Sequence, residues 1–144
     1  MLIRLLTNQI PEYREVIDQT IDKAIPEYQE SLRTKLYEEL LFGISQCWIS
    51  TEAGKFEVII ITRIDPQLDT AKGGKTCTLL AGYAPGGTSS ASFYSGWEIV
   101  SEFAKSQGCD RIDLYTTNPE IEKYMGMFPK IWEAKYYQVS LAEV

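Results

Sequence analysis

The sequence predicts a single α/β domain, and three observations support this prediction. The chain has 144 residues, which suits one domain with a sizeable core. Short β-branched and aromatic runs alternate with segments whose apolar residues recur every three or four positions, as in amphipathic helices. The apolar fraction of 44% and the charged fraction of 24% are those of an ordinary globular protein. Because no repeat, low-complexity tract or linker divides the chain, we expect one domain over residues 1–144.

The first third predicts a strand followed by two helices. Residues 2–6 form a short apolar run typical of a strand. Thr7 or Asn8 can cap the helix that follows, and Pro11 suits its first turn. A second amphipathic helix ends near Gly43, a residue that commonly terminates helices.

The middle of the chain predicts three strands. Residues 46–50 and 56–62 are β-branched and aromatic runs joined by a short turn, which indicates a hairpin. The second run has a continuous apolar stretch, typical of a strand buried on both faces. The polar segment 65–75 predicts a loop, and residues 76–83 predict another strand.

The last part predicts two helices and two strands. A third helix carries its apolar face over residues 93–104 and ends at Gly108. Residues 111–116 alternate as a strand does, and a short fourth helix opens at Pro119. The Tyr-rich tail, residues 131–141, also alternates and predicts a final strand.

Composition excludes several classes of site. The formal charge of -6 argues against a nucleic-acid surface, which needs clustered Lys and Arg. Histidine is absent, so a Ser-His-Asp triad and an imidazole metal ligand are excluded, and we expect no metal. The three cysteines, Cys47, Cys77 and Cys109, lack C-x-x-C spacing and fit reduced core thiols. No apolar run reaches membrane-spanning length and no signal peptide is evident, so we expect a cytoplasmic location.

This order of elements resembles that of the GNAT acyltransferases over essentially the whole chain. The best local match runs from Leu79 to Tyr136, with a helix ending in Ala104-x-x-x-Gly108 and then a strand. Asn118 and Tyr124 fit the Asn and the Tyr of the next helix. The resemblance implies a mixed, mostly antiparallel central sheet flanked by about four helices.

The resemblance also implies a site for acetyl-CoA between the fourth and fifth strands, with the pyrophosphate at the N-terminus of the third helix. Tyr124 would protonate the departing thiolate, and Glu57 would be the general base, with Asp113 a weaker candidate. The residues implied in cofactor binding are Leu80, Gly82, Tyr83, Gly86, Gly87, Thr88, Ser89, Ser90, Ala91 and Asn118.

The phosphate loop departs from the family pattern, Arg/Gln-x-x-Gly-x-Gly/Ala. Counting back from Gly108 puts Thr88, Ala91 and Phe93 at these positions. Phe93 would then place a large ring where the phosphates need close access to the backbone. In a shifted loop, Gly86 and Gly87 would supply the amides instead. Both registers stay open.

Two roles are likewise open for Tyr124. It is either the acid of the resemblance or a core residue beside Ile121 and Met125, and a second register would put Phe128 at the Tyr position and abolish the acid.

The resemblance implies one of two functions. The first is transfer of an acetyl group from acetyl-CoA to a small-molecule or protein amine acceptor. The alternative is a catalytically inactive GNAT-like structural or interaction protein, for example a virion-associated component of a bacteriophage, with protein partners or a second copy of itself. Neither function involves nucleic acid or a membrane, and the alternative would place the protein in a virion.

Overall fold

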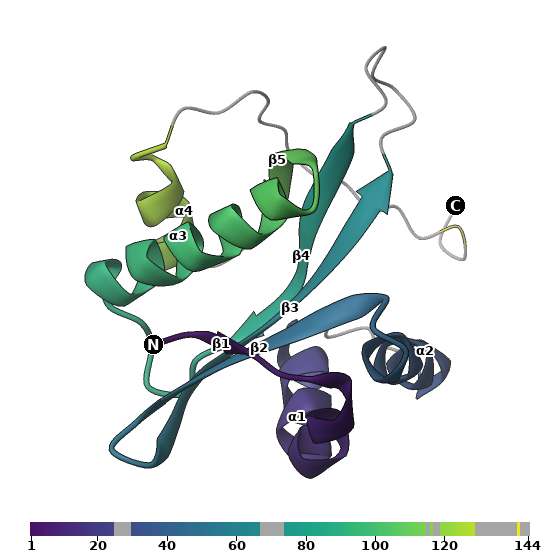
Figure 1. Ribbon diagram of the computed structural model, residues 1–144. Helices are drawn as coiled ribbons and strands as arrows, with labels where there is room; N and C mark the ends of the chain where they lie inside the picture. The colour runs from purple at the N-terminus through teal and green to yellow at the C-terminus, as the bar shows by residue number, and fades with distance from the viewer. Residues whose placement is uncertain (25–29, 67–73, 115, 117–118, 129–140, 142–144) are drawn as a thin grey trace.

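The computed structural model describes residues 1–24, 30–66, 74–114, 116, 119–128 and 141 (Figure 1). In chain order, the elements are β1 (Ile3–Arg4), a 3-10 helix η1 (Thr7–Tyr13), α1 (Arg14–Ala24), α2 (Glu30–Leu41), β2 (Ser45–Glu52), β3 (Lys55–Pro66), β4 (Lys75–Tyr83), α3 (Ser90–Ser106), β5 (Cys109–Leu114) and α4 (Pro119–Met125). The predicted order of strands and helices is confirmed up to α4. The strand predicted over residues 131–141 lies outside the described residues except for Leu141.

The sheet has five strands in the order β1-β2-β3-β4-β5. The first three pairs are antiparallel, whereas β4 and β5 run parallel. A parallel pair needs a crossover connection, and α3 supplies it between β4 and β5. This confirms the predicted mixed, mostly antiparallel sheet.

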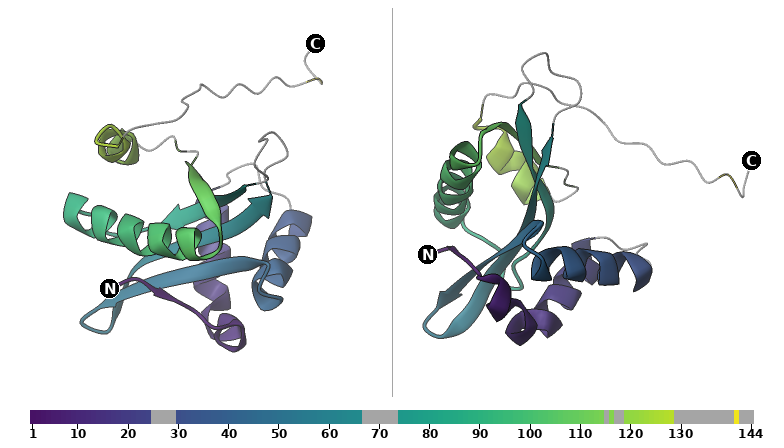
Figure 2. Two further views of the ribbon diagram at one scale, coloured as in Figure 1. Left: turned by 45° about the horizontal axis from the view of Figure 1, so that its top comes forward. Right: turned by 45° about the vertical axis from the view of Figure 1, so that its right-hand side comes forward.

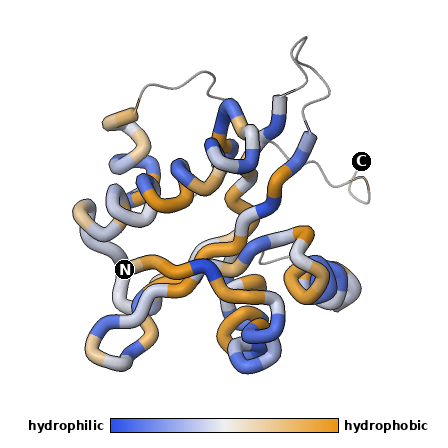
Figure 3. The backbone as a smooth tube through the Cα atoms, viewed as in Figure 1, coloured by the Kyte–Doolittle hydropathy of each residue, from blue (hydrophilic) through white to orange (hydrophobic). Residues whose placement is uncertain are grey.

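Helices cover both faces of the sheet, which gives three layers (Figures 1 and 2). α1 and α2 pack on one face through Ile17, Ile21 and Leu40, which are at most 1% exposed. α3 packs on the other face through Val100 and Ala104. Figure 3 shows the apolar strands running between these layers.

β3 lines both cores. Ile59 and Ile61 belong to the core under α1 and α2, whereas Val58 and Ile60 pack in the core under α3. Successive side chains of a strand point to opposite faces, so a continuous apolar run serves two layers at once. The predicted burial of this strand on both faces is confirmed.

The N-terminal part differs from the prediction in two respects. The strand predicted over residues 2–6 pairs only at Ile3–Arg4, and the first helix begins as the 3-10 helix η1. The capping prediction was wrong, because neither Thr7 nor Asn8 precedes the helix. The residue before it is Leu6, whose backbone N–H donates to Gln9 Oε1 at 2.8 Å. The side-chain hydrogen bond at this helix end therefore comes from Gln9, inside the first turn, and not from Thr7 or Asn8.

The hairpin is confirmed, with a two-residue turn at Ala53 and Gly54. Both residues have positive φ, 52° and 75°, as turns that match the twist of the strands require. The loop prediction over residues 65–75 was wrong at its ends. Asp65 and Pro66 continue β3 and Lys75 begins β4, because the two strands pair as far as Pro66 and Lys75.

Candidate functional site

The ladder between β4 and β5 ends before β4 does. The last parallel pair is Leu79 with Leu114, whereas β4 stays paired with β3 as far as Tyr83 and Ile59. Within the described part of the chain, residues 80–83 therefore have a partner strand on one side only. These residues lie beyond the described β4–β5 ladder, at the carboxyl ends of the two parallel strands, where ligands of α/β proteins usually bind.

A β-bulge lies at the same place. Ile61 pairs with Ala81 and Thr62 pairs with Leu79, so Leu80 is the extra residue. A bulged residue drops out of the ladder, and bulges are over-represented beside active sites because they re-aim backbone and side-chain groups. Leu80 packs its side chain in the core under α1 and α2, and its backbone lies beyond the last described β4–β5 pair.

Gly86 and Gly87 form the turn that connects β4 to α3. The N–H of Gly87 donates to the Ala84 carbonyl at 2.9 Å, and Gly87 has a φ of 78°. A methyl group added at either glycine would meet no other atom within 4 Å. The turn thus leaves open space beside the start of the helix.

Ser89 caps α3. Its Oγ accepts a hydrogen bond from the N–H of Ser92 at 3.1 Å, so the helix begins at Ser90. The amides of Ser90 and Ala91 stand at the positive end of the 17-residue helix, where helices lack internal acceptors. The predicted cofactor-binding residues from Leu80 to Ala91 thus run along the chain from the end of β4 to the first turn of α3, while Asn118 lies outside the described residues.

Phe93 lies one turn inside the helix. Its N–H donates to the Ser89 carbonyl at 2.9 Å, so this amide is already used by the helix. The ring turns toward α4, with its centroid 5.1 Å from that of Tyr124 and 6.1 Å from that of Trp97. Gly86 and Gly87, rather than Phe93, thus border the open space before the helix.

Tyr124 reaches the loop from α4. Its hydroxyl donates to the carbonyl oxygen of Thr88 at 2.9 Å, and its side chain is half-buried. Phe128, the residue of the alternative register, packs on Trp97 and Tyr94 with centroids 4.9 and 5.5 Å apart. Of the two aromatic residues, Tyr124 is the one that contacts the loop.

Glu57 lies at a second bulge, in β3. Ser50 pairs with Val58 and Thr51 with Phe56, so Glu57 is the extra residue. Its Oε2 accepts from Ser50 Oγ at 3.0 Å and its Oε1 from Ser92 Oγ at 3.4 Å.

The bulge thus turns the carboxylate of Glu57 toward the first turn of α3. No hydrogen bond joins Glu57 to Tyr124 in the described structure, so the two predicted catalytic residues are not brought into contact. Asp113, the weaker candidate, is exposed on β5 opposite Thr78.

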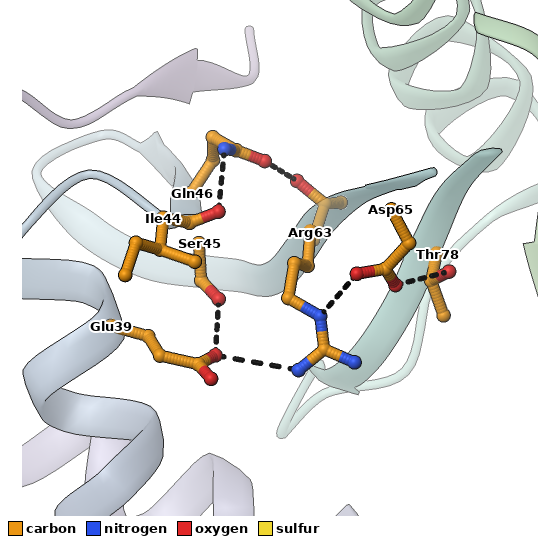
Figure 4. A network of polar contacts seen from close by, with 8 residues as sticks. Glu39, Ile44, Ser45, Gln46, Arg63, Asp65 and Thr78 are labelled. Carbon is orange, nitrogen blue, oxygen red and sulfur yellow. Dashed lines mark hydrogen bonds and ion pairs between the residues drawn. The ribbon is translucent and has the colours of Figure 1, made fainter. Parts of the chain in front are cut away.

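The sequence did not lead us to predict a polar cluster that lies between α2 and the strands of the sheet (Figure 4). Arg63 donates to Asp65 Oδ1 at 2.9 Å and to Glu39 Oε2 at 3.4 Å. Ser45 also donates to Glu39, and Thr78 to Asp65. The spacing of Arg63 and Asp65 in a strand was the available signal, since residues two apart share a face.

The two carboxylates of this cluster, Asp65 and Glu39, stabilise the positive charge of Arg63. Burial lowers the pKa of Arg63, but the hydrogen bonds and negative charges of Asp65 and Glu39 outweigh it and raise this pKa overall. The cluster ties α2 to β3 and β4.

The cysteines behave as predicted for core thiols. Cys47 and Cys77 are buried, and burial raises the pKa of Cys47 to about 12 and that of Cys77 to about 11. Cys109 is half-buried and its pKa is also raised, first by burial. A thiol with a raised pKa is a poor nucleophile near neutral pH.

The described residues contain neither a candidate membrane span nor a candidate metal site. None of the helices found there is both long and apolar enough to span a bilayer. The same residues include no group of three or more His, Cys, Asp or Glu side chains arranged to hold a metal ion.

Comparisons with known proteins bear on the fold. No family model and no curated protein matches the sequence. Solved structures do match along nearly their whole length. A predicted acetyltransferase from Clostridium acetobutylicum, solved with acetyl-CoA, has a TM-score of 0.72 and 12% identity, covering 100% of this chain and 97% of that one.

Two further structures agree. AAC(6')-Iy in complex with the bisubstrate analog CoA-S-monomethyl-acetylneamine has a TM-score of 0.70 and 12% identity, with 97% of each chain covered. A ribosomal-protein-alanine N-acetyltransferase from Brucella melitensis biovar Abortus 2308 has a TM-score of 0.66 and 10% identity, covering 97% of this chain and 99% of that one. The chain therefore has the fold of the GNAT acetyltransferases.

Proposed function

We propose that this protein binds acetyl-CoA and transfers the acetyl group to an amine acceptor. The observation that carries the proposal is the end of β4. There, the bulge at Leu80 and the residues that follow the last described β4–β5 pair lead through the turn at Gly86 and Gly87 to the capped N-terminus of α3. One segment thus combines a strand end that β5 does not pair with in the described residues and a helix end suited to anions.

The helix end suits the phosphates of coenzyme A. The amides of Ser90 and Ala91 point out of the helix, and the helix dipole favours negative charge there. The turn at Gly86 and Gly87 leaves room for a phosphate to approach the backbone. The chain has a formal charge of -6, so this local arrangement, and not the overall charge, would attract the ligand.

The strand end suits the thioester. Backbone groups between Leu80 and Tyr83 would polarise the acetyl carbonyl, because β5 does not pair with them in the described structure. The acceptor nitrogen would attack the carbonyl carbon and lose its proton to a water molecule, and the carbon–sulfur bond would break. The departing thiolate would take a proton from Tyr124, which would regain one from solvent.

The roles of Glu57 and Asn118 stay predictions from the resemblance. Both carboxylate oxygens of Glu57 accept from serine hydroxyls, so as a base it would act through a water molecule.

The similar structures support the chemical class of both substrates. One was solved with acetyl-CoA, and AAC(6')-Iy was solved with the bisubstrate analog CoA-S-monomethyl-acetylneamine. The same protein, an aminoglycoside N-acetyltransferase, was also solved with CoA. We therefore favour a small-molecule amine as the acceptor.

Calorimetric titration with CoA and with acetyl-CoA tests the proposal. We expect wild type to bind both, and Gly86→Val to weaken binding at least tenfold because its side chain would fill the open space before the helix. Thr51→Val in the hairpin is the control, since it introduces the same side chain at an exposed position away from the site. Absence of binding at millimolar ligand would contradict the proposal. Release of free thiol with a panel of amines then tests the transfer.

The virion-associated alternative and the cytoplasmic location remain predictions of the sequence. None of the comparisons bears on them.

A further inference from the structure

A chain of hydrogen bonds joins the β2–β3 hairpin to the first turn of α3. Ser92 Oγ donates to Glu57 Oε1 at 3.4 Å, and Ser89 Oγ donates to Ser92 Oγ at 3.1 Å. From β2, Ser50 Oγ donates to the other carboxylate oxygen, Glu57 Oε2, at 3.0 Å. The carboxylate of Glu57, at the bulge of β3, thus lies between β2 and the start of α3.

The direction of the hydrogen bonds in this chain follows from the carboxylate. A carboxylate only accepts, so the single hydroxyl proton of Ser92 goes to Glu57. Ser92 then has no proton for Ser89, so Ser89 donates its own proton to Ser92 Oγ. The Ser89 oxygen accepts in turn from the N–H of Ser92 as the cap of α3. Both hydroxyl protons are therefore committed to the protein itself and not to a bound anion.

Glu57 also brings negative charge to a helix end that favours anions. Ser92 lies in the first turn of α3, a helix of 17 residues whose N-terminus carries partial positive charge. A carboxylate attached to this turn stabilises the helix, but it repels a phosphate bound at the same end. Glu57 and a phosphate would thus draw on the same positive charge and the same hydroxyl protons.

We propose that Glu57 is an internal anion at the start of α3, which competes with the phosphates of coenzyme A and thereby limits the affinity for the cofactor. This inference rests on the proposed function. It gives Glu57 a role in cofactor binding that differs from that of a general base. Loss of a base would slow acetyl transfer and leave the affinity unchanged, whereas loss of the internal anion raises the affinity.

Calorimetric titration of the full chain with CoA tests this role. Glu57→Gln keeps the length of the side chain and an oxygen that accepts from serine, but it removes the charge. We expect this variant to bind CoA about 2–5 times more tightly than wild type, as is typical for the loss of one partly exposed charge. A purely structural role predicts the opposite sign, because loosening the start of α3 would weaken binding.

Ser92→Ala is a second, independent variant. It removes the link between the carboxylate and α3 and releases the proton of Ser89 for a phosphate, while the backbone N–H at position 92 still donates to Ser89. We therefore expect tighter binding of CoA here too. Glu102→Gln is the matched control, because it removes the same charge from an exposed position nearer the other end of α3. It should bind CoA as wild type does.

The outcomes separate the internal anion from the proposed function. Tighter binding by Glu57→Gln or Ser92→Ala, with Glu102→Gln at the wild-type value, would support the internal anion. Unchanged or weaker binding by both variants, or an equal gain in Glu102→Gln, would overturn it and leave the proposed function standing. Failure of wild type and of every variant to bind CoA would overturn both.

Discussion

At the scale of single residues, Thr62 joins two strands through a buried hydroxyl. The hydroxyl accepts from Trp48 Nε1 and donates to Gln46 Oε1, both at 2.9 Å, and Thr62 is 0% exposed. Trp48 places its indole in the core under α3, where an unpaired N–H would be costly. The Thr62 hydroxyl therefore stabilises the β2–β3 hairpin by satisfying the buried indole N–H of Trp48.

Thr62→Val tests this role. The substitution keeps the shape but removes the acceptor of the Trp48 indole, so we expect the free energy of unfolding to fall by about 1–3 kcal/mol. Urea unfolding measures the change. Thr62→Ser, which keeps the hydroxyl, is the matched control and should lose less. An unchanged midpoint in Thr62→Val would show that the indole finds another partner.

Among the secondary-structure elements, the salt bridges of Arg63 connect α2 to the sheet. Glu39 lies in α2, whereas Arg63 and Asp65 lie in β3. The side chain of Glu39 is 13% exposed and that of Arg63 29%, so water screens this pair less than an ordinary surface pair. Figure 4 shows Arg63 lying between the two carboxylates.

Arg63→Met leaves Glu39 half-enclosed without its cation. We expect a loss of about 1–2 kcal/mol of stability, because removing one partner of a partly buried pair leaves the other unpaired. Glu39→Gln/Arg63→Met in a double-mutant cycle isolates the pair from the Asp65 contact. Additive losses in that cycle would show that Arg63 acts through Asp65 alone.

For the whole molecule, the two cores share one sheet and each contains a buried thiol. Cys47 lies in the core under α1 and α2, and Cys77 in the core under α3. Because β3 lines both cores, we expect them to unfold together in one transition.

The buried thiols make the stability of the folded state depend on alkaline pH. Burial raises the pKa of Cys47 from 9.0 to about 12 and that of Cys77 from 9.0 to about 11. Above pH 9 the unfolded chain releases these protons while the folded chain keeps them. The free energy of unfolding therefore falls as the pH rises, by about 2 kcal/mol for each thiol and about 4 kcal/mol for the two together between pH 8 and pH 10.5.

Urea midpoints measured across this pH range check the prediction. Cys47→Ala/Cys77→Ala lacks both thiols and should show a shallower decline than wild type. Equal slopes for the two proteins would mean that other groups cause the alkaline loss.

Much of the fold could be predicted from the sequence, because the signals are local. Three- and four-residue apolar spacing predicted the helices, and the Val58 to Ile61 run predicted a strand between two cores. The cap at the first helix was missed because Gln9 replaces Thr7 or Asn8 from inside the turn. The candidate site was only partly predictable. The segment from Leu80 to Ala91 came from a resemblance. The cluster around Arg63 had one local signal, the two-residue spacing of Arg63 and Asp65, but its partner Glu39 lies far away in sequence.

The sequence by itself determined the type and order of the elements, which faces they bury, and that the thiols lie in the core, since periodicity and composition act over a few residues. Only the tertiary structure decided the register of β4 against β3 and β5, that bulges fall at Glu57 and Leu80, and that Tyr124 meets Thr88. These features depend on the register between strands and on the packing of helices distant in sequence. Register is set by pairing across the sheet, which no short stretch of sequence encodes alone.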